Sequence, residues 1–297
     1  MNPLSAYFGD EPILPSRRGL TWQAIAALVL LTITYIPILG SMIQHWRIVP
    51  DYSHGFLIVP LALIFAYEKK FHLKAARIEG SWWGVGLLAI GLGLLALGQL
   101  GSLLSPLRAG YVLSLMGFVL LFLGAEVFRL LLFPMCFLLL MVPLPQSLVN
   151  VVAFPLQLIA AKWAVSALQM IGVPVLLEGN IIHLASGDLF VAEACSGLRS
   201  LMALMTLGVV FAHFFRRDSL LQQLILIAST VPIAILVNAL RVAVTGFLAH
   251  QYGHETAGGV IHDFQGLITF SLAFLLLLFE SRLLSRLLDS RALSGNY

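Results

Sequence analysis

Long apolar runs separated by short polar segments constrain the fold of this 297-residue chain more than any other feature. Hydrophobic residues make up 60% of the sequence and charged residues 10%, whereas soluble domains are about half apolar and about a quarter charged. The mean hydropathy is +0.96. Because the runs cover most of the length, we expect a single all-α polytopic membrane domain over residues 1–297, without a separate soluble domain.

The apolar runs predict about eight transmembrane helices. They cover, approximately, residues 22–43, 56–67, 82–100, 108–124, 130–142, 196–215, 220–250 and 262–282. A polar tail, residues 1–20, precedes the first. Polar side chains interrupt residues 146–171, so we expect an interfacial or re-entrant helix there rather than a crossing. Residues 172–194 contain short β-like runs and glycine-containing turns. Such backbone cannot face lipid, so we expect a small β-hairpin outside the bilayer.

The distribution of positive charge supports this layout. Of the 17 Lys and Arg residues, twelve lie on one side, which the positive-inside rule identifies as the cytoplasm. They are Arg17, Arg18, Lys69, Lys70, Lys74, Arg77, Arg129, Arg216, Arg217, Arg282, Arg286 and Arg291. The tail of residues 1–20 is then cytoplasmic and the hairpin of residues 172–194 is extracytoplasmic. The net charge of +3 therefore reflects topology, and no long basic run indicates nucleic-acid binding.

Polar groups are concentrated in residues 193–201, with the sequence Glu-Ala-Cys-Ser-Gly-Leu-Arg-Ser-Leu. Residues from about Ser196 onward indicate a helix, so Cys195 should lie at or just before its first turn. The partial positive charge of a helix N-terminus and Arg199, one turn on, both favour the nucleophilic thiolate. The alternative is an inert, buried cysteine. That is the interpretation we favour for Cys136, whose neighbours are apolar.

The predicted topology brings three more polar side chains to the outer face. Asn238 and Arg241 lie about twenty residues into the seventh span, and His262 opens the last one. With Cys195, this set suits acyl transfer: the thiolate attacks a carbonyl, His262 transfers the proton, and Arg241 stabilises an oxyanion. A snorkelling Arg241 and an interfacial His262 are the alternatives. His54, before the second span, either serves the same site or caps that span.

Several segments in this order resemble the exosortase family of multi-pass membrane proteins. They are Asp51-Tyr52-Ser53-His54-Gly55, Val142-Pro143-Leu144-Pro145, residues 193–201, Asn238-Ala239-Leu240-Arg241-Val242, and His262. The resemblance implies a cysteine transpeptidase or protease of the bacterial plasma (inner) membrane, with Cys195, Arg241 and His262 as the catalytic triad, and often a link to exopolysaccharide production. The implied substrates are secreted proteins whose C-terminal sorting signal holds a Pro-Glu-Pro motif, a transmembrane helix and a basic tail.

We further expect Arg199, Asn238 and His54 to contribute to substrate binding, with Arg199 or Arg241 pairing with the glutamate of the signal. No cofactor or metal motif is visible in the sequence. The expected partners are membrane-anchored substrates, the lipid bilayer and an acceptor of open identity, with no nucleic acid. Hydrolysis and transpeptidation both stay open. A transporter or channel, or a non-catalytic subunit of a polysaccharide export or polymerisation assembly, are the competing interpretations.

Overall fold

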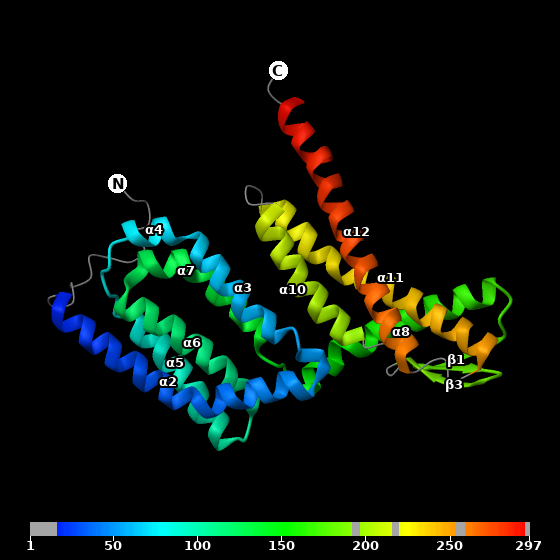
Figure 1. Ribbon diagram of the computed structural model, residues 1–297, viewed down its shortest axis with the longest axis horizontal. Helices are drawn as coiled ribbons and strands as arrows, with labels where there is room; N and C mark the ends of the chain where they lie inside the picture. Colours follow the sequence, from blue (N-terminus) through cyan, green and yellow to red (C-terminus); the bar gives the residue numbers. More distant parts are fainter. Residues whose placement is uncertain (1–16, 192–196, 216–219, 254–258, 295–297) are drawn as a thin grey trace. The chain divides into compact units, whose positions relative to one another are not determined.

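The computed structural model describes residues 17–191, 197–215, 220–253 and 259–294, and side chains within residues 22–191, 202–214, 220–253 and 264–286. The chain divides into two compact units, Met1–Pro145 (unit 1) and Gln146–Tyr297 (unit 2). Figure 1 shows the elements of each unit. Each unit has its own helical packing.

Unit 1 consists of helices connected by short loops. They are α2 (Arg17–Ile48), α3 (Gly55–Glu68), α4 (Lys70–Ala75), α5 (Trp83–Leu100), α6 (Leu104–Phe122) and α7 (Gly124–Leu138), with the short 3-10 helices η1 (Pro50–Tyr52) and η2 (Leu139–Met141). The expected second span, residues 56–67, agrees with α3 to within about a residue. Helix α2 begins at Arg17, so the last residues of the expected polar tail are helical.

Helices α5 and α6 pack closely because small residues line their contact. Gly84, Gly91 and Gly98 are buried at seven-residue spacing on one face of α5. A Cβ atom at Gly91 would lie 2.5 Å from the backbone nitrogen of Ser114 on α6, so only glycine allows this approach. The hydroxyl of Tyr35 on α2 lies 3.0 Å from the Ser114 hydroxyl, which joins the third helix to this contact.

Among its described residues, unit 2 combines four helices with a small sheet. Its elements are α8 (Gln146–Met170), β1 (Val175–Glu178), β2 (Ile181–Leu184), β3 (Gly187–Phe190), α10 (Gly197–Phe215), α11 (Leu220–Tyr252) and α12 (Gly259–Ser294). The strands are antiparallel in the order β1-β2-β3. The expected β structure is confirmed, although three strands form rather than a single hairpin. Gly179, at φ +61°, permits the tight turn between β1 and β2.

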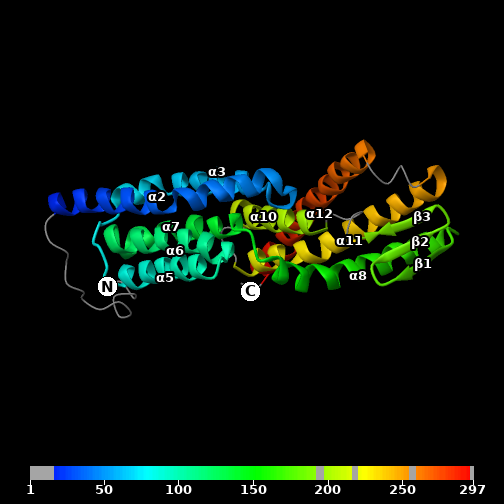
Figure 2. The ribbon, with the colours of Figure 1, turned by 90° about the horizontal axis from the view of Figure 1, so that it is seen from below.

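Two apolar clusters hold unit 2 together. The first joins the C-terminal halves of α8 and α11 to the sheet through residues such as Leu168, Ile182 and Val242. Figure 2 shows the strands beside these two helix ends. The second joins α10, α11 and α12 through Leu204, Leu226 and Leu277. The sheet is therefore anchored at the end of α11 that lies beyond Arg241.

Within the described residues, seven helices are long and apolar enough to cross a membrane. They correspond to α2, α5, α6, α7, α8, α11 and α12, which confirms an all-α polytopic membrane protein with a small sheet. Helix α3 and the described apolar part of α10, Met202–Phe214, are shorter.

The structure corrects the expectation for residues 146–171. They form one unbroken helix of 25 residues, α8, which has the length and composition of a span. A re-entrant segment needs a break in the helix, so that alternative is wrong. The polar residues that suggested it are partly paired along the helix: the Gln146 amide donates to the Asn150 side-chain oxygen at 3.0 Å. The interfacial alternative stays a prediction.

Candidate functional site

Arg241 is held inside unit 2 by the packing of α11 against α12. Its side chain is 4% exposed, within a helix long enough to span a membrane. Its guanidinium lies over Gly266 of α12, where a Cβ atom would be 3.7 Å from Nη2. A charged group in a span is costly unless it faces protein or water, so Arg241 has the placement of a functional residue and not of a snorkelling anchor.

Two further polar residues adjoin Arg241, and the sequence analysis missed both. The Thr245 hydroxyl lies 2.8 Å from Gln265 Oε1 and 2.9 Å from the Arg241 carbonyl oxygen. Gln265 is 9% exposed, and its Nε2 has no hydrogen-bond partner among the described residues. The spacing held a signal for them: Thr245 follows Arg241 by one helical turn, and Gln265 follows His262 by three residues.

The antiparallel register of α11 and α12 determines how far His262 lies from Arg241 along the helix axis. The Thr245–Gln265 contact lies toward one end, and the Ser229 hydroxyl donates to Glu280 at 2.5 Å toward the other. The Arg241 backbone is therefore level with residues 268–269, and its guanidinium extends to Gly266. His262 lies in α12 one turn before Gly266, so its backbone is about 6 Å further along the helix.

Helix α10 is also antiparallel to α11, with Gly208 facing Thr230. Gly197 lies eleven residues before Gly208, and Arg241 lies eleven residues after Thr230. Both intervals rise about 16 Å along their helices, so the first turn of α10 is level with Arg241. The backbones of α10, α11 and α12 thus have the register that the predicted triad requires.

The predicted site residues of unit 2 are described to different extents. Asn238 is half-buried and, with Arg241, lines a cavity of about 10 Å³ between α10, α11 and α12. This volume is about that of one water molecule. Arg199 and His262 belong to described helices, but their side chains lie outside the described residues, as does Cys195 altogether. The meeting of thiol, guanidinium and imidazole therefore stays a prediction.

Comparison with known protein families shows which family this chain belongs to. The profile of the transmembrane exosortase family (Exosortase_EpsH) matches residues 46–279, which is more than three quarters of the chain. The chain belongs to the transmembrane exosortase family. Comparison with curated proteins gives no match, and comparison with solved structures gives none either. The matched region contains every site residue predicted from the sequence.

In this exosortase, His54 belongs to unit 1 and contacts a loop. Its Nδ1 lies 3.0 Å from the Asp51 carbonyl oxygen. Burial lowers the pKa of His54, which favours the neutral imidazole. The residue occupies the N-cap position of α3, but its side chain makes no capping hydrogen bond there. Its position therefore agrees with the expected cap of the second span, without a side-chain hydrogen bond, and the substrate-binding role stays a prediction.

Cys136 differs from its expected placement. It is exposed on the surface of α7 and not buried, although its sequence neighbours are apolar as expected. A membrane span presents apolar residues to lipid, so an apolar environment in sequence did not imply a buried position. The residue supplies a thiol outside unit 2, which makes it a useful control for Cys195.

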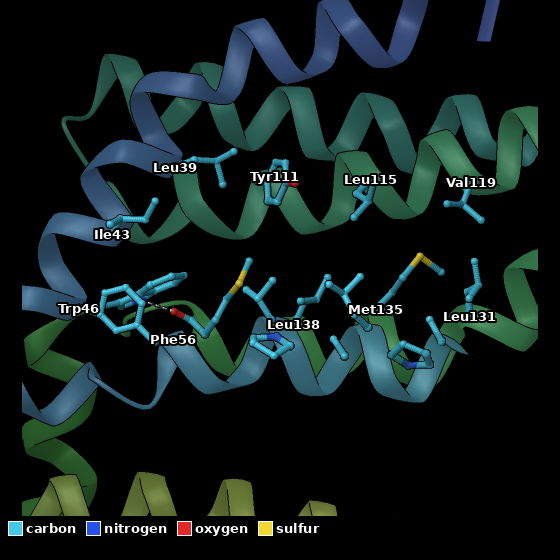
Figure 3. Close-up of a pocket in the computed structure, with 17 residues that line it drawn as sticks. Leu39, Ile43, Trp46, Phe56, Tyr111, Leu115, Val119, Leu131, Met135 and Leu138 are labelled. Atoms are coloured by element: carbon cyan, nitrogen blue, oxygen red, sulfur yellow. Dashed lines mark hydrogen bonds between the residues drawn. The ribbon is translucent and has the colours of Figure 1, made fainter. Parts of the chain in front are cut away.

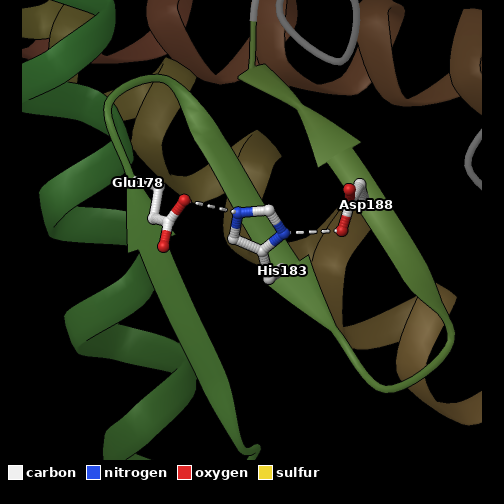
Figure 4. Close-up of polar contacts among 3 residues, drawn as sticks. All are labelled: Glu178, His183 and Asp188. Atoms are coloured by element: carbon white, nitrogen blue, oxygen red, sulfur yellow. Dashed lines mark hydrogen bonds and ion pairs between the residues drawn. The ribbon is translucent and has the colours of Figure 1, made fainter.

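The sheet carries a group of three polar side chains on its surface. Figure 4 shows His183 between Glu178 and Asp188 on one face of the strands. Its Nδ1 lies 2.7 Å from Asp188, and its Nε2 lies 3.5 Å from Glu178. The hydrogen bond to Asp188 is the main cause of a raised pKa for His183. These contacts tie the three strands together at the surface.

Proposed function

We propose that this exosortase is a membrane-embedded cysteine transpeptidase or protease. It cleaves the C-terminal sorting signals of secreted proteins at the outer face of the bacterial plasma membrane. The observation that carries the proposal is the shared level of three elements in unit 2: the first turn of α10, Arg241 on α11, and the first turns of α12. The triad residues belong to, or directly precede, these elements.

The reaction has two balanced steps. The Cys195 thiolate adds to the carbonyl carbon of the scissile peptide bond, and the C–N bond breaks as His262 gives a proton to the leaving amine. The product is a thioester and a released C-terminal helix. Water or another nucleophile then attacks the thioester carbonyl, transfers its proton to His262, and expels the thiolate.

Arg241 stabilises the negative charge that develops on the carbonyl oxygen in both steps. A guanidinium stays protonated at neutral pH, so it serves as a fixed donor and not as a base. Its position against Gly266 leaves no intervening side chain on that part of α12. The unpartnered Nε2 of Gln265 offers a second, neutral donor to a carbonyl of the substrate backbone in the same region.

The proposed location follows from charge and hydropathy together. With residues 146–171 kept on one side of the bilayer, the cytoplasmic concentration of Lys and Arg favours an outer-face position for the start of α10, which is periplasmic in a bacterium with two membranes. A sorting signal with one transmembrane helix would present its Pro-Glu-Pro segment at that depth. Arg241 or Arg199 then pairs with the glutamate. A link to exopolysaccharide production belongs to the same proposal.

Replacing each of the two cysteines with alanine in turn tests the mechanism. A secreted reporter that ends in a Pro-Glu-Pro motif, an apolar helix and a basic tail is expressed with wild-type protein, Cys195→Ala or Cys136→Ala. We expect Cys195→Ala to abolish cleavage at normal protein abundance and Cys136→Ala to leave it unchanged. Mass spectrometry of the wild type with a sorting-signal peptide should also detect a thioester at Cys195.

Each competing function gives a different result. Full reporter cleavage by Cys195→Ala would end the thiol mechanism. A transporter or an export subunit would show no thioester and would keep its contribution to polysaccharide secretion in the same variant. For the glutamate pairing, reversing the reporter glutamate to arginine should reduce cleavage. If Arg199 is the partner, Arg199→Glu should then restore part of the cleavage, and no rescue would exclude that pairing. Because Arg241→Glu also removes the oxyanion donor, a pairing with Arg241 is tested by restored binding of the reporter and not by cleavage.

A further inference from the structure

An elongated apolar cavity of about 690 Å³ lies within unit 1, between α2, α3, α6 and α7. Figure 3 shows Tyr111, Leu115 and Val119 of α6 along one wall, with Leu138, Met135 and Leu131 of α7 among the residues opposite. The volume lies in the usual range of small-molecule sites, about 300–1,000 Å³. A cavity with hydrocarbon walls does not hold ordered water but does bind apolar molecules. An alkyl chain is the ligand that matches this lining.

Arg108 stands at one end of this wall. Tyr111, Leu115 and Val119 follow one another at the three- and four-residue spacing of a helix face, and Arg108 is the preceding position on that face. Its side chain is 3% exposed. Arginine is always charged in proteins, and a buried charge in a span marks a functional site by default.

The guanidinium has unused hydrogen-bonding capacity. Its Nη2 makes one long contact, 3.4 Å, with the Ser41 carbonyl oxygen of α2. Its Nε is buried and has no hydrogen-bond partner in the part of the chain that the structure describes. A guanidinium offers five N–H donors in a planar fork that matches phosphate oxygens. This donor set is complementary to an anionic group placed beside Arg108.

The same end of the cavity carries aromatic and polar groups. The His45 and Tyr52 rings lie 5.2 Å apart, and Trp46, which lines the cavity, donates to the Met141 carbonyl at 3.1 Å. Burial and the charge of Asp51 raise the pKa of Tyr52, while Arg108 acts on it in the opposite direction. Tyrosine and tryptophan with a polar contact are typical of the membrane interface. Arg108 does not line the cavity itself, but it lies one helical turn before Tyr111, which does, so a buried cation adjoins the interfacial end of an apolar cavity.

We propose that unit 1 binds one phospholipid, with an acyl chain in the cavity and the phosphate against Arg108. Basic pockets between transmembrane helices recognise lipid head groups in this way. Under the topology predicted from charge, the headgroup lies in the outer leaflet. The site is separate from the residues of unit 2 and does not depend on the proposed cysteine chemistry.

Native mass spectrometry of the full-length protein tests the proposal, after exchange into detergent with phosphatidylglycerol as the probe. Arg108→Gln should weaken retention of one lipid about tenfold, because it removes a charge-assisted hydrogen bond to phosphate. Arg108→Lys should retain part of it. Arg47→Gln is the matched control, because Arg47 is exposed near the same end of unit 1. It should retain the lipid fully.

A second pair of variants tests the cavity proposed for the acyl chain, independently of the phosphate contact. Leu115→Trp fills the cavity and should reduce retention, whereas Leu97→Trp, at an exposed position of α5, should not. Size-exclusion profiles establish that each variant is folded. Adding inorganic phosphate should not displace the bound lipid, because binding also requires the acyl chain.

Three results would overturn the proposal. Equal lipid loss in Arg108→Gln and Arg47→Gln would indicate only the lipid that surrounds any span. Retention of lipid by Leu115→Trp would exclude the cavity. A photo-crosslinker at position 115 that captures a sorting-signal helix and no lipid would assign the cavity to substrate.

Discussion

The hydrogen bond between Thr245 and Gln265 joins α11 to α12 beside Arg241, and its removal should have an asymmetric effect on stability. The Thr245 hydroxyl has one proton and lies near two acceptors, Gln265 Oε1 and the Arg241 carbonyl. Thr245→Val removes this donor and leaves the buried Gln265 amide without its partner. Gln265→Met removes an amide whose Nε2 is already unsatisfied, and the threonine keeps its contact to the Arg241 carbonyl.

The magnitudes follow from these partners. An unsatisfied buried polar group costs about 1–3 kcal/mol, while interhelical hydrogen bonds in membranes average about 0.6 kcal/mol and reach about 1.7. We expect Thr245→Val to lower the free energy of unfolding by about 1–2 kcal/mol and Gln265→Met to change it by less than about 0.5 kcal/mol. In the double variant no partner is left unpaired, so its loss should be smaller than that of Thr245→Val alone, by about 1 kcal/mol.

Reversible unfolding in mixed micelles, followed by tryptophan fluorescence, measures this cycle. Thr230→Val is the matched control: Thr230 is buried in the same helix, and its hydroxyl bonds locally to the Ile227 carbonyl. Combined with Gln265→Met, it should give additive changes to within about 0.5 kcal/mol. Additive losses for Thr245→Val with Gln265→Met, or a larger loss for Gln265→Met than for Thr245→Val, would refute this account of the site.

Three other predictions follow from the same structure. Gly91→Ala should destabilise unit 1 by about 1–3 kcal/mol through overpacking, measured by thermal aggregation, whereas Gly93→Ala, with open space around it, should not. The pKa of His183 is raised in the folded state, so its stabilising contacts are complete below its unfolded pKa and are lost as pH rises through the folded value. The amide protection factors of residues 175–190, which correct for the intrinsic base catalysis of exchange, should therefore fall as pH rises through the folded pKa of His183, and Asp188→Asn should remove that fall. Arg241→Lys keeps the charge but not the planar fork, and reporter cleavage at normal protein abundance should fall about 10–100-fold.

Much of the fold was predictable because the position of a membrane helix depends on the hydropathy of its own residues, which the sequence gives directly. Uninterrupted apolar runs located α2, α3, α5 and α11 closely, and the turn residues around Gly179 located the strands. The re-entrant alternative for α8, which its unbroken helix excludes, has a local cause. Polar side chains such as Gln146 and Asn150 pair within one helix, and sequence alone does not reveal that pairing.

The candidate site was predictable only in part, since its register depends on packing. Arg241 was identified because a charge inside an apolar run is unusual. Thr245 and Gln265 are ordinary residues in sequence, and their importance follows from the contact between α11 and α12. The same holds for Arg108, which the sequence places near a helix end and which the structure buries one helical turn before the cavity-lining Tyr111.

Stability alone does not account for the polar residues of unit 2. Helices α11 and α12 are apolar along most of their contact, and a matched apolar pair at positions 245 and 265 would satisfy that packing with no amide left open. Thr245 and Gln265 instead position a buried amide beside Arg241, where a substrate carbonyl or backbone amide could use its open end. The double variant should therefore keep nearly full stability but lose reporter cleavage, with a larger effect on kcat than on KM. Gln265→Glu, which keeps the side-chain length but not the amide donors, separates the two roles. Full cleavage by the double variant would mean that the pair serves packing alone.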